Sequence, residues 1–220
     1  RRERKNIIIG LGKAEAILAP NEQVSIEEYK LNDRIRVYVL EVKQTSKGPM
    51  ITVSRTHPDL VKRLFELEVP EVREGVVEIK SIAREAGSRT KIAVYSKNPD
   101  VDAVGACVGP NGYRVNVIVS ELRGEKIDII NYSTSPEEYI KSALSPSKVV
   151  AVETNPKGQS AKIVVPDHQL SLAIGKEGQN ARLAAKLTGW KIDIKSESQA
   201  KTSDFIDELD KVLQDSSDSE

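Results

Sequence analysis

Two short glycine turns whose first residues are 66 positions apart are the features of this sequence best suited to binding chemistry. The first reads Gly109-Pro110-Asn111-Gly112 and the second reads Gly175-Lys176-Glu177-Gly178. Glycine has no Cβ, so a phosphate can approach the backbone of such a turn closely. Each turn leads into an amphipathic stretch, and the free N–H groups at the start of a helix favour an anion. The spacing therefore predicts two sites that hold the backbone of a single-stranded nucleic acid.

Basic and polar side chains near the turns are candidates for further contacts. They are Arg114 after the first turn, and Lys176, Gln179, Asn180, Arg182 and Lys186 in or after the second. Arg182 and Lys186 are four residues apart and share one helix face. The basic residues either contact phosphates or merely solvate an exposed surface. Gln179 and Asn180 either bind a base edge or cap a helix.

Apolar residues beside the turns have two interpretations. They are Val104, Val108 and Val115 near the first turn and Leu172, Ile174 and Ala181 near the second. They either line a groove for nucleobases or pack the adjacent helices. For any single residue, core packing is the favoured interpretation, since a half-buried helix needs most of its apolar residues for the core.

The sequence around the turns is duplicated. Both copies close on the same tetrapeptide, at Lys126-Ile127-Asp128-Ile129 and at Lys191-Ile192-Asp193-Ile194. Periodicity predicts helix, strand, strand, short helix, turn, helix and strand in each copy. In the first copy the helix is predicted at 58–69, the two strands at 76–83 and 90–95, the short helix at 101–107, the helix after the turn up to 122, and the last strand at 126–130. In the second copy the same elements are predicted at 137–143, 148–153, 161–165, 167–173, up to 187, and 190–194. We call residues 58–133 the first repeat and residues 134–199 the second repeat.

The residues before the repeats predict an all-β segment. Short apolar or β-branched runs at 7–9, 14–18, 34–42 and 50–53 are separated by glycine and proline turns. Such a pattern is typical of a small barrel. The fold class expected for the whole chain is therefore α+β.

Composition limits the classes of function. The 220 residues include one cysteine and two histidines, so neither an internal disulfide nor an ordinary zinc site is expected. No apolar run has membrane-spanning length, and a reducing, cytoplasmic location is expected. Cys107, in an Ala-Cys-Val context, is interpreted as a buried structural thiol rather than a nucleophile.

The formal net charge of zero hides an asymmetry. Residues 201–220 carry two basic and seven acidic side chains, while the rest of the chain carries 31 basic and 26 acidic ones. A basic body favours a polyanionic partner, although both parts can equally be solvated surface. In the acidic tail, 200–220, apolar residues at helical spacing predict either a short amphipathic helix or a frayed end: Phe205, Ile206, Leu209, Val212 and Leu213.

The order of these segments resembles a known domain arrangement. A β-barrel followed by two copies with Gly-x-x-Gly between adjacent helices resembles an S1 domain of the OB type and two tandem bacterial-type (type II) KH domains. The stretches Ser54-Arg55-Thr56-His57-Pro58 and Leu187-Thr188-Gly189-Trp190 strengthen the likeness. With them, the chain resembles the NusA family of transcription elongation factors. The resemblance implies an S1 domain at 1–57, KH domains at 58–133 and 134–199, and the tail.

The resemblance also implies a function and partners. It implies binding of nascent single-stranded RNA during pausing, termination and antitermination, with RNA polymerase and other Nus-type factors as partners. No catalysis, cofactor or membrane is implied, and a monomer is expected. The family's first S1 strand and its polymerase-binding domain would precede Arg1, so we expect a fragment of a longer protein, with an open edge on the partial barrel.

Two departures from a uniform RNA-binding surface are expected. Many KH turns carry a basic residue at a middle position, and Pro110-Asn111 carries none, so the second turn should grip phosphate better. The N-terminal segment has few aromatics, mainly Tyr29 and Tyr38, so weak base stacking is expected there.

Two alternatives of other classes remain open. One is the KH and S1 region of an RNA-degrading exoribonuclease. Its KH-before-S1 order and the missing cluster of acidic metal ligands argue against it. The other is a structural module whose KH domains bind protein. A nuclease assay tests the first, and salt-dependent RNA binding tests the second.

Overall fold

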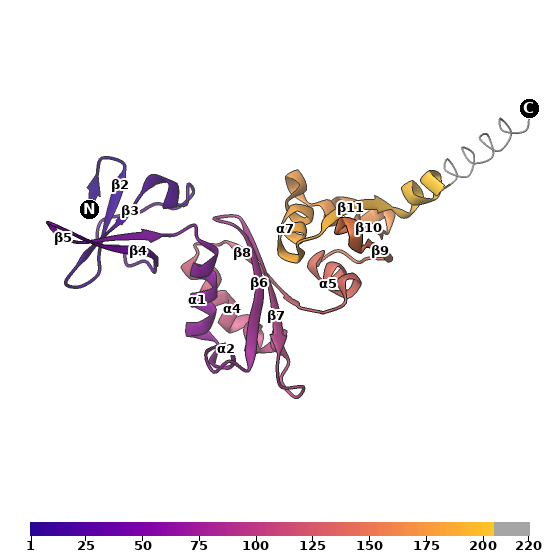
Figure 1. Cartoon of the computed structure of the whole chain (residues 1–220), viewed down its shortest axis with the longest axis horizontal. Helices are drawn as coiled ribbons and strands as arrows, with labels where there is room; N and C mark the ends of the chain where they lie inside the picture. Colours follow the sequence, from indigo (N-terminus) through magenta and orange to yellow (C-terminus); the bar gives the residue numbers. More distant parts are fainter. Residues whose placement is uncertain (205–220) are drawn as a thin grey trace, which may run out of the picture. The chain divides into compact units, whose positions relative to one another are not determined.

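The computed structural model describes residues 1–204 and separates the chain into two compact units. One unit comprises Arg1–Asn131, and the other starts at Tyr132. Figure 1 shows both, and each is described by itself below. The apolar residues predicted to form a helix in the acidic tail begin at Phe205 and lie outside the described residues.

The first unit opens with the predicted β segment. Its strands are β1 (Arg2–Glu3), β2 (Asn6–Gly10), β3 (Glu15–Leu18), β4 (Tyr38–Thr45) and β5 (Gly48–Ser54). They form one sheet in the order β1-β2-β3-β5-β4, with a 3-10 turn, η1 (Pro20–Glu22), after β3. A small core of Ile7, Ala16, Leu18 and Val53 lies on this sheet. In the described residues β1 and β4 are the two ends of the sheet, so an S1-like sheet with open edges is present.

One predicted strand begins later than expected. The alternating residues from Arg34 predict a strand over 34–42, but β4 starts at Tyr38. The backbone of Arg36 is used elsewhere: its N–H donates to Glu121 Oε1 at 3.0 Å, and its carbonyl accepts from Arg55 at 2.8 Å. These side-chain bonds replace ladder bonds, so the strand prediction is wrong over the first four residues.

The first repeat has the predicted order of elements. Helix α1 (Pro58–Glu68) is followed by α2 (Pro70–Arg73), β6 (Val77–Glu85), β7 (Arg89–Ser96), α3 (Ala103–Val108), the turn η2 (Pro110–Gly112), α4 (Tyr113–Glu121) and β8 (Lys126–Asn131). Helix α2 was not predicted. Pro70 ends α1 as expected, but proline also suits the first turn of a new helix, and α2 starts on it.

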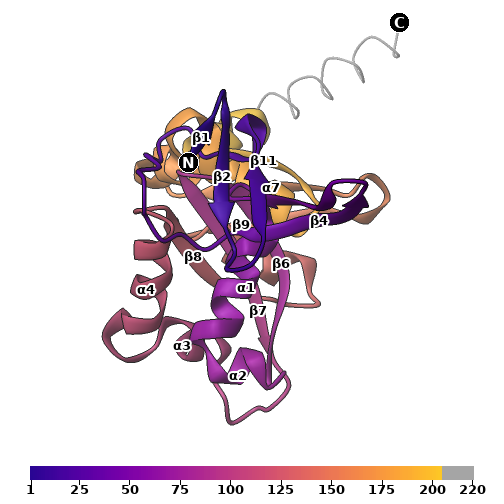
Figure 2. The same ribbon diagram turned by 90° about the vertical axis from the view of Figure 1, so that its left-hand side faces the viewer.

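The helices of the first repeat lie against its three-stranded sheet β6-β7-β8 (Figures 1 and 2). Leu60, Leu64 and Phe65 of α1 form the core with Ile92 and Val94 of β7. Cys107 of α3 and Ile118 of α4 complete it. The helical spacing in α1 and the alternation in β7 therefore place these side chains in the layer between the helices and the sheet.

The second repeat has the same architecture. It comprises α5 (Pro136–Ala143), β9 (Ala151–Asn155), η3 (Pro156–Gly158), β10 (Ser160–Val165), η4 (Asp167–Gln169), α6 (Leu170–Ile174), η5 (Lys176–Gly178), α7 (Gln179–Thr188) and β11 (Lys191–Ser196). Helical residues 197–204 follow. In both repeats the middle strand pairs antiparallel with the first strand and parallel with the last.

The duplicated tetrapeptide has a structural explanation. In the parallel pair β7–β8, Lys91 lies opposite Asp128, and in β10–β11, Lys162 lies opposite Asp193. Opposite charges facing each other across neighbouring strands stabilise the pairing. In the first repeat Lys91 Nζ reaches Asp128 Oδ2 at 2.9 Å. The repeated lysine and aspartate thus mark the same register in both sheets.

Arg55 joins the N-terminal sheet to the first repeat. It lies in the link between β5 and α1, and its side chain is fully buried. Its Nε and Nη2 donate to the two carboxylate oxygens of Glu27 at 3.0 and 2.6 Å, and Nη1 donates to Arg36 O and Glu121 Oε1. Nη2 also donates to Glu121 O at 2.9 Å. All five N–H groups of the guanidinium are therefore bonded, and they tie the loop before β4 to the end of α4.

Candidate nucleic-acid interface

The two glycine turns have nearly the same backbone conformation. Gly109 has φ 75° and ψ 172°, and Gly175 has 78° and 171°. At the third position of the turn, Asn111 has φ 52° and ψ 29°, and Glu177 has φ 53° and ψ 28°. The closing glycines, at φ 74° and 73°, agree equally well. Three positive φ values in four residues explain the glycines, because few L-residues adopt them. The sequence repeat is thus a repeat of backbone shape.

The residue five positions after the first glycine supports the turn in each repeat. In the second repeat this is Asn180, which is 3% exposed. Its Nδ2 donates to Leu144 O at 3.1 Å and to Ala173 O at 3.0 Å, so the amide N–H groups are bonded to the backbone. Of the two roles foreseen for Asn180, base recognition is therefore wrong in this structure. Its amide braces the end of α6, just before the turn.

Arg114 occupies the matching position in the first repeat. Its Nη1 donates to Ala106 O at 2.7 Å and to Glu71 Oε2 at 2.9 Å. The aliphatic part of the side chain lies against Gly109, where an added Cβ would come within 2.6 Å of Arg114 Cγ. Arg114 therefore holds the turn and α2 together. A phosphate contact for Arg114 stays a prediction, and its charge is already paired with a carboxylate.

The second turn carries exposed positive charge. Lys176 and Lys186 are exposed, and neither makes an ion pair within residues 1–204. Arg182 Nη1 donates to Glu177 O at 3.0 Å, which holds its guanidinium beside the turn. Gln179 is half-buried at the first position of α7, and the side chain of Glu177 is exposed. Lys176 and Arg182 thus lie at a turn with one carboxylate, and Lys186 adds a third exposed cation farther along α7, an arrangement suited to an anionic backbone.

Two aliphatic side chains just before the second turn keep exposed surface. Leu172 is 45% exposed and Ile174 is 37% exposed. Both belong to α6, which ends at the turn, and Ala181 of α7 is half-buried. In the first repeat Val104 and Val115 pack against the core and Val108 is half-buried. The packing interpretation therefore applies to Val104 and Val115, while Leu172 and Ile174 keep surface that a base can cover.

The first turn is chemically different from the second. Pro110 stands where the second turn has Lys176, and proline has no backbone N–H to donate. The position of Arg182 is taken by Asn116, and that of Lys186 by Ser120. The first turn therefore presents the same backbone shape with one donor fewer and without the three cations.

The aromatic residues of the N-terminal sheet are engaged within the protein. Tyr38 stacks on His57 with ring centroids 4.6 Å apart, and its hydroxyl donates to Asp59. The hydroxyl of Tyr29 accepts from the backbone N–H of Val24, and the guanidinium of Arg123 lies 5.7 Å from its ring centre. Burial raises the pKa of Tyr29 to about 12. These contacts occupy part of both rings, and weak base stacking by this segment stays a prediction.

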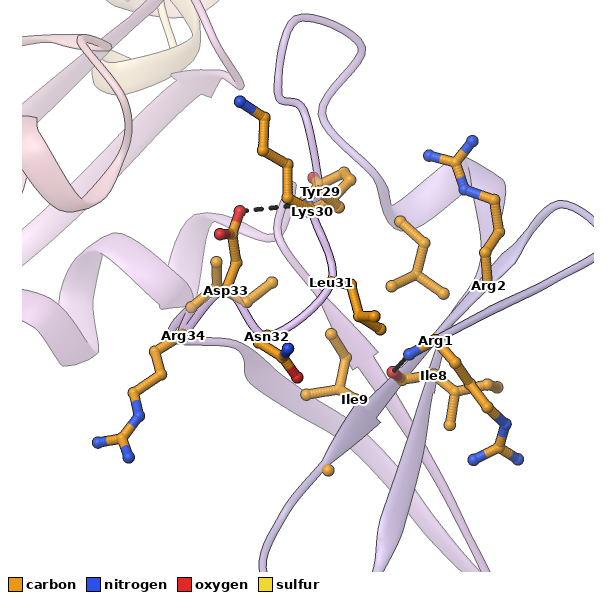
Figure 3. A pocket seen from close by; sticks show the side chains of 13 residues that line it. Arg1, Arg2, Ile8, Ile9, Tyr29, Lys30, Leu31, Asn32, Asp33 and Arg34 are labelled. Carbon is orange, nitrogen blue, oxygen red and sulfur yellow. Dashed lines mark hydrogen bonds between the residues drawn. The ribbon is translucent and has the colours of Figure 1, made fainter.

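A hollow of about 600 Å³ lies beside strand β2 (Figure 3). Ile7, Ile9 and Leu31 contribute apolar side chains to its lining, and four basic residues lie around it: Arg1, Arg2, Lys30 and Arg34. Asp33 also lines the hollow, and Arg1 and Lys30 are paired with nearby glutamates, so the excess positive charge comes mainly from Arg2 and Arg34. An excess of positive charge beside an apolar floor can attract a polyanion without stacking its bases. The hollow is a secondary candidate surface, which inspection of sequence spacing did not find.

Cys107 lies in an environment that suppresses the reactivity of its thiol. The thiol is fully buried, and burial raises its pKa to about 12. The prediction of a buried structural thiol is confirmed. Within residues 1–204 no group of three or more His, Cys, Asp and Glu side chains is placed to hold a metal ion. In the same range no helix is long and apolar enough to cross a membrane.

Two domain profiles match the chain. The profile of the NusA-like first KH domain matches residues 55–132, and that of the NusA-like second KH domain matches residues 136–202. Each match contains one of the glycine turns. The α+β fold with two KH domains is therefore confirmed.

Relatives support the same assignment. The chain is 62% identical over 201 residues to the transcription termination/antitermination protein NusA of Halalkalibacterium halodurans, covering 91% of this chain and 53% of that protein. It is also 62% identical over 201 residues to the NusA protein of Bacillus subtilis, covering 91% of this chain and 54% of that protein. To the NusA protein of Thermus thermophilus it is 47% identical over 206 residues, covering 94% of this chain and 52% of that protein. The chain thus spans about half the length of the curated relatives it matches. None of these relatives is an exoribonuclease. The chain belongs to the NusA family, in the region that carries the two KH domains.

Proposed function

We propose that this chain binds single-stranded RNA as part of a transcription elongation factor that acts in termination and antitermination. Each KH repeat would hold about four nucleotides. The observation that carries the proposal is the second turn: a positive-φ glycine backbone from Gly175 to Gly178 that carries Lys176, has Arg182 bonded to it, and follows the exposed Leu172 and Ile174. Cations supply affinity for phosphate, and the apolar surface supports the bases.

The site residues of the proposal follow from this geometry. Direct RNA contacts are assigned to the two turns, to Lys176, Arg182 and Lys186, and to Gln179 at the edge of the second turn. Asn180 supports the site from beneath, and Arg114 chiefly supports the first turn. The N-terminal sheet contributes weakly, through charge around the hollow.

The wider role rests on the relatives. Their names describe transcription termination and antitermination, and we extend that role to this chain. RNA polymerase and other Nus-type factors are the proposed protein partners, and the cytoplasm is the proposed location. The proposed mode of action is binding as a monomer, without a cofactor and without making or breaking a covalent bond.

The test compares two substitutions at Gly178 that differ only in charge. An added Cβ at Gly178 meets nothing closer than Arg182 Nη1 at 4.0 Å, whereas at Gly175 it would lie 2.8 Å from the backbone nitrogen of Asn180. Gly178→Asp therefore places a carboxylate at the turn without a clash, and Gly178→Asn is its uncharged isostere. Both residues tolerate a positive φ better than others, so both variants should lose a similar roughly 1 kcal/mol of stability.

The measurement is filter binding to 12-nucleotide single-stranded RNAs of mixed sequence. A carboxylate about 5 Å from a phosphate costs on the order of 1–3 kcal/mol at a protein surface, so Gly178→Asp should bind roughly 5- to 100-fold more weakly than Gly178→Asn. Binding of the unsubstituted chain should fall steeply with salt, because phosphate contacts release counterions. Equal affinities of the Asp and Asn variants, with equal thermal stability, would show that no phosphate lies at the second turn.

A further inference from the structure

A tyrosine stands directly beside the first glycine turn. Tyr113 follows Gly112, is the first residue of α4 and is 69% exposed. In a helix the Cα–Cβ bond tilts toward the N-terminus, which for Tyr113 is the side of the turn. Exposing an aromatic ring to this extent has no benefit for packing. The matching residue of the second repeat is Gln179, which is half-buried.

The surroundings of Tyr113 make electrostatic capture weak. Pro110 offers no N–H, Asn111 is neutral, and Arg114 is bonded to Glu71. The second turn has Lys176, Arg182 and Lys186 at the positions of Pro110, Asn116 and Ser120. Both turns nevertheless keep the same backbone conformation, which implies that both can still receive a nucleic-acid strand.

We infer that Tyr113 is a base-stacking platform, so that the first repeat holds RNA mainly by its bases and the second mainly by its phosphates. The inference rests on the proposed function and assigns the two turns different chemistry. Every base has a π-face, so a single exposed tyrosine provides affinity with little sequence preference. A strand whose phosphate lies at Gly109 to Gly112 would place the neighbouring base over the ring of Tyr113.

Three variants of Tyr113 and one control test the inference. Tyr113→Phe keeps the ring, and Tyr113→Gln installs the residue of the second repeat at a position where it can remain exposed. Tyr95→Gln is the control, since Tyr95 is a second exposed tyrosine of the same repeat. It alternates with Ile92 and Val94 of the core, so it faces the side of the sheet opposite to α3 and α4. Tyr113→Leu separates stacking from simple apolar contact.

Two RNA ligands of 12 nucleotides distinguish base from backbone: a mixed-sequence oligomer and its abasic counterpart. Tyr113→Gln should bind the mixed oligomer roughly 5- to 100-fold more weakly, the range observed when a stacking aromatic is removed. Its affinity for the abasic oligomer should not change. Tyr113→Phe and Tyr95→Gln should bind both like the unsubstituted chain, and Tyr113→Leu should fall with Tyr113→Gln.

Salt dependence gives an independent readout. Each phosphate contact to single-stranded RNA contributes about −0.7 to the slope of log K against log salt. Tyr113→Gln should leave the slope unchanged, while Lys176→Gln should make it shallower by about that amount. If Tyr113→Gln binds the mixed oligomer like the unsubstituted chain, or loses affinity equally for both oligomers, the stacking role is wrong while the proposed function stands. If the unsubstituted chain binds no RNA, both are wrong.

Discussion

Removing the Arg55 side chain should destabilise the first unit far more than removing any surface ion pair. Arg55→Met would leave the carboxylate of Glu27, which is 1% exposed, buried without its partner. It would also leave the carbonyls of Arg36 and Glu121 without their side-chain donor. Breaking a buried ion pair in this way costs about 3–5 kcal/mol.

The expected shift in melting temperature follows from the size of the unit. For the 131 residues from Arg1 to Asn131, the entropy of unfolding is about 0.28 kcal/mol per kelvin. A loss of about 4 kcal/mol therefore lowers Tm by roughly 15 °C. Arg63→Met is the matched control, because the Arg63–Glu66 pair is as short, at 2.6 Å, but the Arg63 side chain is 62% exposed and Glu66 is only half-buried. It should cost less than about 1 kcal/mol.

Two probes in one thermal experiment locate the effect. Far-UV circular dichroism follows the whole chain, whereas fluorescence of the single tryptophan, Trp190, follows the second unit. Arg55→Met should shift the circular dichroism transition by roughly 15 °C and the Trp190 transition much less. The double variant Arg55→Met with Glu27→Leu should recover most of the loss, because replacing both charges by apolar groups removes the uncompensated carboxylate. A loss below about 1 kcal/mol, or no recovery in the double variant, would refute a buried Arg55–Glu27 pair.

Two further predictions concern buried groups near the turns. Asn180→Ala should destabilise the second unit by about 1–3 kcal/mol in urea unfolding followed by Trp190 fluorescence, because the carbonyls of Leu144 and Ala173 lose their donor; an unchanged midpoint would mean that the amide is not a brace. Cys107 should react with iodoacetamide at pH 8 at least roughly 100-fold more slowly in the folded chain than in urea, since its buried thiol has a pKa of about 12 and the thiolate is the reactive form. Rapid labelling of the folded chain, detected by mass spectrometry, would contradict that environment.

Most of the secondary structure could be predicted because it depends on short-range patterns. The spacing of Leu60, Leu64 and Phe65 and the proline at position 58 predict α1, and the structure places α1 at Pro58–Glu68. The start of β4 could not be predicted, because Arg36 bonds to Arg55 and Glu121, which are distant in sequence. Alternation in 34–37 is indistinguishable from that of a strand until those partners are placed.

The candidate site also has a part that could be predicted from the sequence and a part that could not. The turns themselves were predictable, since glycine at two positions permits a backbone that other residues rarely adopt. The sequence leaves open whether Arg114 contacts phosphate or only solvates a surface, and whether Asn180 binds a base or caps a helix. In the structure both brace their turns. Equivalent positions thus perform the same structural task with different side chains, and only the contacts reveal it.

By itself, the sequence determined the duplication, the shape of the two turns and the family, because these depend on residue type and spacing along the chain. The tertiary structure alone decided which polar groups near the turns are committed to the protein and which remain available to a ligand. It buried Asn180, paired Arg114 with Glu71, and left Lys176 and Tyr113 exposed. Availability depends on what the folded chain places beside a side chain, and those neighbours come from segments distant in the sequence.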